Sequence, residues 1–445
     1  MDVPQSNGSP ATAWAELFAA PLFTTDRQMG ALLAEEGRRN GSTVNLIASE
    51  SYCPRATVEV EASILVTKNA SGYPGAREVA GCEVFDKIER LAQRRAERLF
   101  GADHANVQAI ASTVANIAVL RALLDPGDRI LSLQGSAGGH HSHGAAYHLT
   151  GQDYAVTGFG VDEAAQGIDL EAVRRLAEEV RPRIIIAGST AYPRAIDFRG
   201  LQRVAESVGA LFFADIAHVA GLVAAGIHEN PTLYSDVVTT STHKTFCGPR
   251  TGGLVLCKTR HAAAIDAAVY PGLQGAPGAH IIASRAVLFD LAAREPFRRL
   301  MLAVVTNAQA LSGALQEANL PLYLGGTDTH MVVIDLRQKP WDPLRVERRL
   351  ERHGLLVNRV GLPPRKADKS GLGLRLGTTA MTIRGMSARE FAELGPIIAG
   401  LLEDGDGDRM ESAAFGEIAA LARRYPLPDA ALVPHTANVE ESLHA

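Results

Sequence analysis

The sequence contains little cysteine. Its 445 residues include four cysteines, none of them in a CxxC pair. A disulfide framework, or a zinc site built on cysteines, needs several of them at characteristic close spacings. We therefore expect reduced thiols, as in a cytoplasmic protein. The cysteines are Cys53, Cys82, Cys247 and Cys257.

Long apolar runs and an excess of positive charge are also missing. No apolar run approaches the roughly 20 residues that cross a bilayer, so we expect no membrane span. The opening stretch MDVPQSNGSPATAWAELFAA lacks a charged segment followed by an apolar core, and it predicts no secretory signal. The net charge of −5 offers no basic surface to nucleic acid. These absences favour a soluble globular protein.

Several catalytic motifs are absent as well. The chain has no GxxxxGKS or GxxxxGKT loop, no HExxH, no GxSxG, and no predicted strand that opens into GxGxxG. The absences argue against P-loop nucleotidases, zinc proteases, α/β-hydrolases and Rossmann dinucleotide enzymes.

Strands and helices are predicted to alternate through much of the chain. Short β-rich runs are separated by helical segments such as 170–180 and 201–208. This alternation is typical of a mostly parallel sheet with helices on both faces. The predicted strands are Arg129–Leu133, Arg183–Ala187, Leu211–Ile216, Val237–Thr240 and Leu254–Cys257.

A different pattern follows a long helical region at about 280–318. Strands predicted at 331–336, 355–360 and 374–376 alternate with longer helices, which indicates a smaller α+β domain. We therefore divide the chain into three parts. Residues 1–40 form a flexible N-terminus and a helical arm, residues 41–295 a large α/β/α domain, and residues 296–445 a small C-terminal domain.

Two chemically distinct groups follow neighbouring predicted strands. Asp215 ends the run LFFAD, with His218 close behind, and Lys244 follows the run VVTTSTH. Ligands of parallel sheets bind at the carboxyl ends of the strands. A carboxylate and an amine at that edge suit pyridoxal phosphate (PLP), because the carboxylate keeps the pyridine nitrogen protonated and the amine forms a Schiff base. For either residue alone, a helix cap or an exposed lysine is the commoner role.

Two segments are candidates for binding a phosphate. Ser112 and Thr113 precede an apolar helical run, and a helix N-terminus attracts phosphate; an ordinary helix cap is the alternative. The turn from Gly272 to Gly275 could reach a phosphate from a neighbouring subunit, or be a plain turn.

Histidines and one arginine complete the candidate site. The segment GGHHSHG at 138–144 has no cysteine or carboxylate close in sequence, so stacking of His140 on an aromatic cofactor explains it better than a metal site. Arg375 lies inside a predicted strand, where a buried guanidinium needs an anionic partner. A substrate carboxylate or a structural ion pair would meet that need.

Eight segments along the chain match the pattern of one enzyme family. The most specific are ADIAHVAGLVAAG (214–226) and TTSTHKTFCGPRTGG (239–253). The others are LIASES, GYPGAREVAGCE, FGADHANVQ, GGHHSHG, AYPRAIDF and LRLGTTAMTIRGM. Together they resemble serine hydroxymethyltransferase, collinearly over roughly residues 25–425. The resemblance implies a fold-type I PLP-dependent transferase, similar in fold to aspartate aminotransferase.

The resemblance also implies roles for individual residues. Lys244 would carry PLP as a Schiff base, Asp215 would pair with the pyridine nitrogen, and His218 would lie near the phenolic oxygen. Arg375 and Ser49 would bind the carboxylate of a small amino-acid substrate. Further cofactor contacts would come from His140, Ser112, Thr113, Thr190, Ser241 and His243, and from Gly272 and Gly275 of a partner subunit in a homodimer or dimer of dimers.

The chain departs from the family in one loop. Where the family reads close to KYAEGYPGKRYYGGCE, this chain has KNASGYPGAREVAGCE at 68–83. Asn69 and Val79 replace two active-site tyrosines, and Ser71 replaces a glutamate that handles protons and folate. Val360 stands where the family has a folate-contacting asparagine. We expect the loop positions to shape substrate binding.

These departures predict that the PLP and amino-acid sites persist and that tetrahydrofolate is not used. A serine cannot act as a general acid or base near neutral pH, and such a group contributes about 10²–10⁴-fold to a rate. The leading hypothesis is folate-independent aldol or transaldol chemistry at the Cα–Cβ bond of a β-hydroxy amino acid, with an aldehyde as a second substrate, of the kind found in specialised biosynthesis. The alternatives are genuine folate-dependent hydroxymethyl transfer, another PLP reaction (decarboxylation, β-elimination, racemisation or transamination), or an inactive paralogue.

Overall fold

The largest element of the molecule is a seven-stranded sheet of strand order β4-β10-β9-β8-β7-β5-β6. The computed structural model describes the chain except for residues 1–9, 251, 340, 365–370, 404–407 and 429–445. Strands β5 to β9 pair in parallel, whereas β10 runs antiparallel to both β9 and β4, so the predicted mostly parallel sheet is confirmed. The strands are β4 (His104–Asn106), β10 (Gly253–Cys257), β9 (Val237–Ser241), β8 (Leu211–Asp215), β7 (Ile184–Gly188), β5 (Arg129–Leu133) and β6 (Ala155–Phe159).

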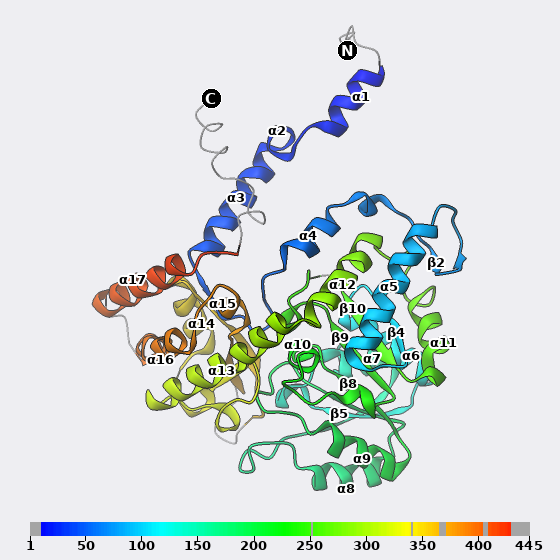
Figure 1. Ribbon diagram of the computed structural model, residues 1–445. Helices are drawn as coiled ribbons and strands as arrows, with labels where there is room; N and C mark the ends of the chain where they lie inside the picture. The colour runs from blue at the N-terminus through cyan, green and yellow to red at the C-terminus, as the bar shows by residue number, and fades with distance from the viewer. Residues whose placement is uncertain (1–9, 251, 340, 365–370, 404–407, 429–445) are drawn as a thin grey trace, which may run out of the picture.

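Helices cover both faces of this sheet because its central strands are apolar on both sides. In β7, Ile185 and Ala187 face one core while Ile184 and Ile186 face the other. The first core packs against α5 (Glu83–Phe100), α8 (Leu170–Val180), α9 (Phe198–Val208) and α12 (Ala279–Ala292). The second packs against α6 (Ser112–Leu123) and α11 (Thr259–Val269) (Figure 1).

A smaller α+β region follows, as predicted. Its antiparallel sheet has the order β11-β14-β13 and its own apolar core. The long helix α13 (Glu295–Glu317) leads from the large region into this core through Leu311 and Leu315. Its other elements include β11 (Met331–Asp335), β13 (Asn358–Gly361), β14 (Leu372–Gly377), α14 (Pro343–Arg352), α15 (Thr379–Ile383), α16 (Ala388–Glu403) and α17 (Asp408–Arg424).

The start of the predicted large domain packs with the small region instead. Strand β1 (Val44–Asn45) pairs in parallel with β12 (Leu355–Leu356), and Val44 and Leu46 belong to the small region's core. The backbone N–H of Gly377 donates to Leu46 O at 2.7 Å. The apolar sequence of this segment predicts that it is buried, but it does not show which of the cores it joins. Residue 41 is therefore not where the large core begins.

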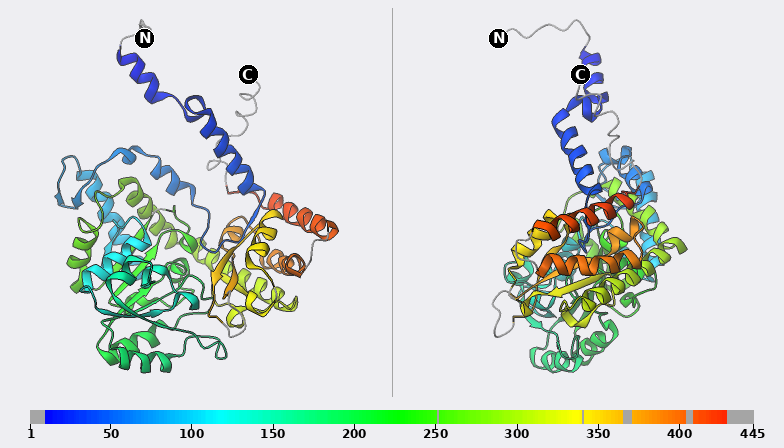
Figure 2. Two further views of the ribbon diagram at one scale, coloured as in Figure 1. Left: turned by 180° about the vertical axis from the view of Figure 1, so that it is seen from behind. Right: turned by 90° about the vertical axis from the view of Figure 1, so that its left-hand side faces the viewer.

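An N-terminal arm projects from the body of the molecule (Figures 1 and 2). It is formed by α1 (Pro10–Ala19), α2 (Leu22–Thr25) and α3 (Arg27–Gly41), whereas residues 1–9 of the predicted flexible N-terminus lie outside the described residues. Large apolar side chains are exposed along it, namely Trp14, Leu17, Phe18, Leu22, Met29, Leu32 and Leu33. Exposed apolar surface of this kind is typical of interaction sites. No helix in the described ranges has the length and apolar character to cross a membrane.

Candidate active site

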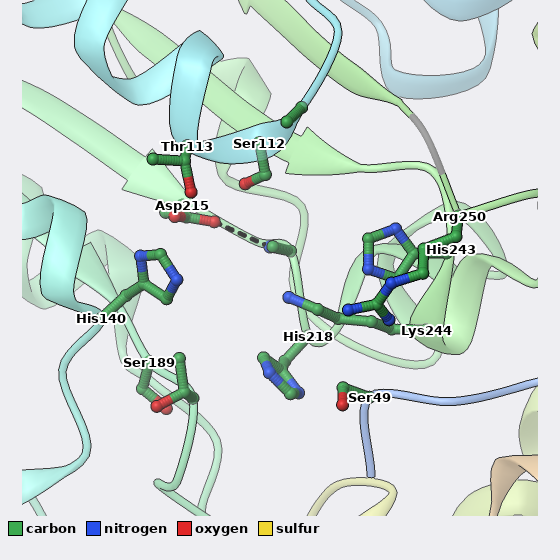
Figure 3. Close-up of a pocket in the computed structure, with 13 residues that line it drawn as sticks. Ser49, Ser112, Thr113, His140, Ser189, Asp215, His218, His243, Lys244 and Arg250 are labelled. Carbon is green, nitrogen blue, oxygen red and sulfur yellow. Dashed lines mark hydrogen bonds between the residues drawn. The ribbon is translucent and has the colours of Figure 1, made fainter. Parts of the chain in front are cut away.

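One cavity of about 220 Å³ brings most of the predicted site residues together (Figure 3). It lies beyond the carboxyl ends of β8 and β9, where Asp215 ends β8 and Lys244 follows β9. Nine of the predicted residues line it: Ser49, Ser112, Thr113, His140, Thr190, Asp215, His218, His243 and Lys244. Ala111, Ser189, Ala217 and Arg250 complete the lining.

Asp215 is a buried carboxylate held by three hydrogen bonds. Its Oδ2 lies 2.9 Å from Nε2 of His143 and accepts from Nδ2 of Asn116 at 2.8 Å, and its Oδ1 accepts from the Ala217 N–H at 2.9 Å. Burial alone would raise the pKa of Asp215, but the hydrogen bonds with His143 and Asn116, together with the nearby imidazole of His140, hold the pKa well below its usual range. The cavity therefore contains a permanent negative charge.

Asn116 and His143 are functional candidates that the sequence analysis missed. Asn116 lies one turn beyond Ser112 in α6, and it also accepts a hydrogen bond from Thr239 Oγ1 at 2.6 Å. His143 belongs to the histidine segment from which only His140 was assigned a role. A buried polar residue on an otherwise apolar helix face was the available signal for Asn116, because such a group requires partners.

Lys244 lies across the cavity with an unusual backbone conformation. Its φ of +60° falls in the left-handed region, a strained conformation for a residue with a side chain and one that clusters at functional sites. Burial lowers the pKa of Lys244 to about 8; Asp215 opposes this shift, and Arg375 and Arg250 add to it. The lowered pKa increases the fraction of this amine that is neutral and nucleophilic near neutral pH.

His140 follows two glycines whose backbone positions are closely constrained. Gly138 has φ +103°, and its carbonyl accepts from the Thr190 N–H at 2.7 Å. A Cβ on Gly139 would lie 2.0 Å from Leu133 O, so no side chain fits there. Nδ1 of His140 lies 2.6 Å from Ser142 Oγ. Burial lowers the pKa of His140 to about 3, so the ring is neutral.

Two further imidazoles line the cavity as neutral rings. Burial holds the pKa of His218 well below its usual range and lowers that of His243 to about 3, and the charge of Lys244 adds to both shifts. Neutral imidazole can donate from one nitrogen and accept at the other.

Arg375 lies next to the cavity rather than in its wall. It is on β14, is 7% exposed, and donates to Thr190 O and, at 3.2 Å, to Asn358 Oδ1. Burial lowers the pKa of Arg375 to about 10, and no carboxylate among the described residues pairs with it. A buried guanidinium without a carboxylate partner is suited to an anionic ligand.

Several predicted residues lie outside the cavity of the single chain. Ser241 is buried in β9 and donates to Ala217 O at 3.3 Å. Asn69 Oδ1 accepts from the N–H and hydroxyl of Ser71 at 3.3 and 3.1 Å, and Val79 packs against the first core. The turn that contains Gly272 and Gly275 is tied to the segment before α6, because Gln274 bonds Ile110 N at 3.1 Å and Gln108 O at 2.8 Å.

The imidazoles of the histidine segment face different partners. The rings of His140 and His141 lie 3.9 Å apart and tilted by 36°, while His143 is directed to Asp215. In the part of the chain that the structure describes, no group of three or more His, Cys, Asp or Glu side chains is arranged to hold a metal ion.

Comparison with known proteins gives one consistent result. Residues 22–398 match the family model of serine hydroxymethyltransferase. A curated serine hydroxymethyltransferase from Coprothermobacter proteolyticus is 43% identical over 406 residues, which cover 90% of this chain and 96% of that protein. The range matched by the family model contains every residue that lines the cavity.

Proposed function

The chain belongs to the serine hydroxymethyltransferase family of fold-type I PLP-dependent enzymes, and we propose that it makes or breaks the Cα–Cβ bond of a small β-hydroxy L-amino acid such as serine. The observation that carries the proposal is that one cavity contains both an ionised, buried Asp215 and a Lys244 whose pKa is lowered to about 8. A PLP enzyme needs a group of each kind.

The donor set of the cavity fits PLP. Lys244 supplies the amine for the aldehyde, and Asp215 supplies the anion for a protonated pyridine nitrogen. Ser112 and Thr113 supply hydroxyls at the N-terminus of α6, which favours phosphate. His140 supplies a flat neutral ring. When bound, PLP draws electrons away from the Cα of an amino acid, which weakens the bonds at that carbon.

The same cavity provides for the substrate. Arg375, next to the cavity, would bind the α-carboxylate together with Ser49 in the cavity wall, because Arg375 is a buried guanidinium with no carboxylate partner among the described residues. The amine of Lys244 can accept and return a proton near neutral pH because its pKa is lowered to about 8.

We further propose that the active enzyme is a cytoplasmic homodimer or dimer of dimers. Phe18 of the arm is 87% exposed, and six other large apolar side chains of the arm are exposed as well. A second copy of the chain would cover these side chains. The loop with Asn69 and Ser71 and the turn at Gly272 lie outside the cavity of their own chain, so a second copy could contribute them to its partner's site. Four free cysteines suit a reducing compartment.

Two candidates for the second substrate fit this proposal. The relative from Coprothermobacter proteolyticus is named a serine hydroxymethyltransferase, which favours tetrahydrofolate as the acceptor of the carbon unit. The expectation that folate is not used has no support from that comparison. A specific observation favours the second candidate, a free aldehyde: Asn69, Ser71 and Val79 stand where the family has two tyrosines and a glutamate.

Turnover of serine with and without tetrahydrofolate decides between the two. Glycine and methylenetetrahydrofolate formed only when folate is present would establish the hydroxymethyltransferase reaction. Glycine formed at the same rate without folate, with release of an aldehyde, would establish the folate-independent reaction. If no β-hydroxy amino acid yields glycine under either condition, the proposed function is wrong.

Restoring the loop glutamate gives a sharper test of the role of position 71. We expect Ser71→Glu to raise the folate-dependent rate by about 10²-fold, because it returns a titratable group to the loop. Ser71→Gln is the matched control, since it has the same size without a titratable proton. Steady-state kinetics with serine and tetrahydrofolate measures the difference. Equal rates for wild type and Ser71→Glu would show that position 71 takes no part in proton transfer.

A further inference from the structure

His330 is a buried imidazole directly behind the cavity, and nothing in the proposed chemistry yet uses it. It is 0% exposed and immediately precedes β11. Its Nε2 lies 3.1 Å from Ala48 O and 3.5 Å from Nδ1 of His218. The rings of His330 and His218 are nearly parallel, at 22°, with centroids 5.6 Å apart.

His330 contacts three parts of the molecule, through Ala48, His218 and Thr378. Ala48 precedes Ser49, which lines the cavity, and His218 belongs to the large region. The carbonyl of His330 accepts from the N–H and hydroxyl of Thr378, at 3.0 and 3.3 Å, just beyond the strand that carries Arg375. These bonds fix the His330 ring relative to the cavity.

The hydrogen-bond partners determine where the protons of both rings lie. A backbone carbonyl can only accept, so Nε2 of His330 must carry the proton that points to Ala48 O. Nδ1 of His218 faces that same N–H, and a proton on Nδ1 would place two donors against each other. His218 is a neutral ring, because its pKa is well below its usual range. Its single proton therefore lies on Nε2.

We propose that His330 is a positioning residue that fixes the tautomer and orientation of His218, so that His218 presents Nε2–H as a hydrogen-bond donor. The inference rests on the proposed function, in which His218 lies beside the cofactor. His330 itself touches neither cofactor nor substrate. A donor fixed in one orientation stabilises the transition state more than a ring that exchanges tautomers does, because it needs no reorganisation during the reaction.

Two substitutions separate this role from simple packing. His330→Gln keeps an N–H donor at a position close to that of Nε2, whereas His330→Leu fills the space without a donor. Should His330→Leu fail to fold, His330→Met makes the same comparison. The readout is the ¹⁵N NMR signal of His218 in the PLP-bound protein without substrate, assigned by its loss in His218→Asn.

The proposal predicts distinct signals for the two nitrogens of His218 in wild type and His330→Gln. In His330→Leu we expect the two signals to move toward each other as the tautomers mix, and kcat to fall about tenfold with KM little changed. Unchanged His218 signals in the apolar variant, or equal changes in both variants, would overturn the proposal. The NMR result does not depend on which bond is broken, so it can stand or fail independently of the proposed function.

Discussion

Replacing Lys244 with alanine is expected to lower the rate of Cα–Cβ cleavage by on the order of 10⁴-fold and to remove the covalent attachment of PLP. Among the described residues, Lys244 is the one lysine that lines the cavity, and its lowered pKa of about 8 suits both nucleophilic attack and proton transfer. Borohydride reduction followed by peptide mapping measures the attachment directly. Wild type should give a pyridoxyl label on the peptide that contains Lys244, and Lys244→Ala should give none.

Lys258 provides the matched control for this experiment. It follows β10 as Lys244 follows β9, but its Nζ donates to Leu233 O at 3.3 Å and it does not line the cavity. Lys258→Ala should therefore retain both the label and the rate. A pyridoxyl label on any peptide other than that of Lys244 would contradict the assignment, as would near wild-type turnover by Lys244→Ala.

Replacing Asp215 with asparagine is expected to lower the rate by about 10²–10³-fold, because it removes the fixed negative charge opposite the cofactor's ring nitrogen. The substitution keeps the shape of the side chain but cancels its charge, and the new amide donors would face His143 and Asn116. We therefore expect some loss of thermal stability along with the loss of rate. Steady-state kinetics at saturating PLP, together with a thermal unfolding curve, measures the two effects separately.

Substitution of Asp236 is a control that distinguishes a loss of catalytic rate from a loss of stability. It lies at the opposite end of the same sheet, just before β9, and pairs with Arg260 and His261. Asp236→Asn should lower stability and leave the rate per folded molecule unchanged. If Asp215→Asn behaves in the same way, with an undiminished rate at saturating PLP, Asp215 does not serve the ring nitrogen.

The strands that carry the site were predictable because their signal is local. β5 matches its predicted range, Arg129–Leu133, and β8 and β9 differ from theirs by one residue at one end. Buried parallel strands are short apolar runs bounded by polar residues, so both the strand and the functional group at its end stand out. This is why the positions of Asp215 at the end of β8 and of Lys244 beyond β9 could be predicted from the sequence alone.

Edge strands and long-range partners were not predictable. β4, His104–Asn106, has three residues and too little pattern to identify, and β6 lies at the other edge of the sheet. The contacts of Asp215 with Asn116 and His143 join residues 99 and 72 positions apart in the chain. Only the packed structure shows which buried polar groups pair, and His330 could not be connected to His218 from the sequence for the same reason.

The central claim is that the Cα–Cβ bond is the bond that reacts, and product analysis tests it most directly. Wild-type enzyme with PLP would be incubated with a panel of L-amino acids that includes serine and threonine, with and without tetrahydrofolate, and the products identified by mass spectrometry. We expect glycine, with the carbon fragment as an aldehyde or on folate, from at least one β-hydroxy amino acid, and no glycine with Lys244→Ala. An amine, a keto acid or a D-amino acid as the main product, with no glycine from any substrate, would contradict the account.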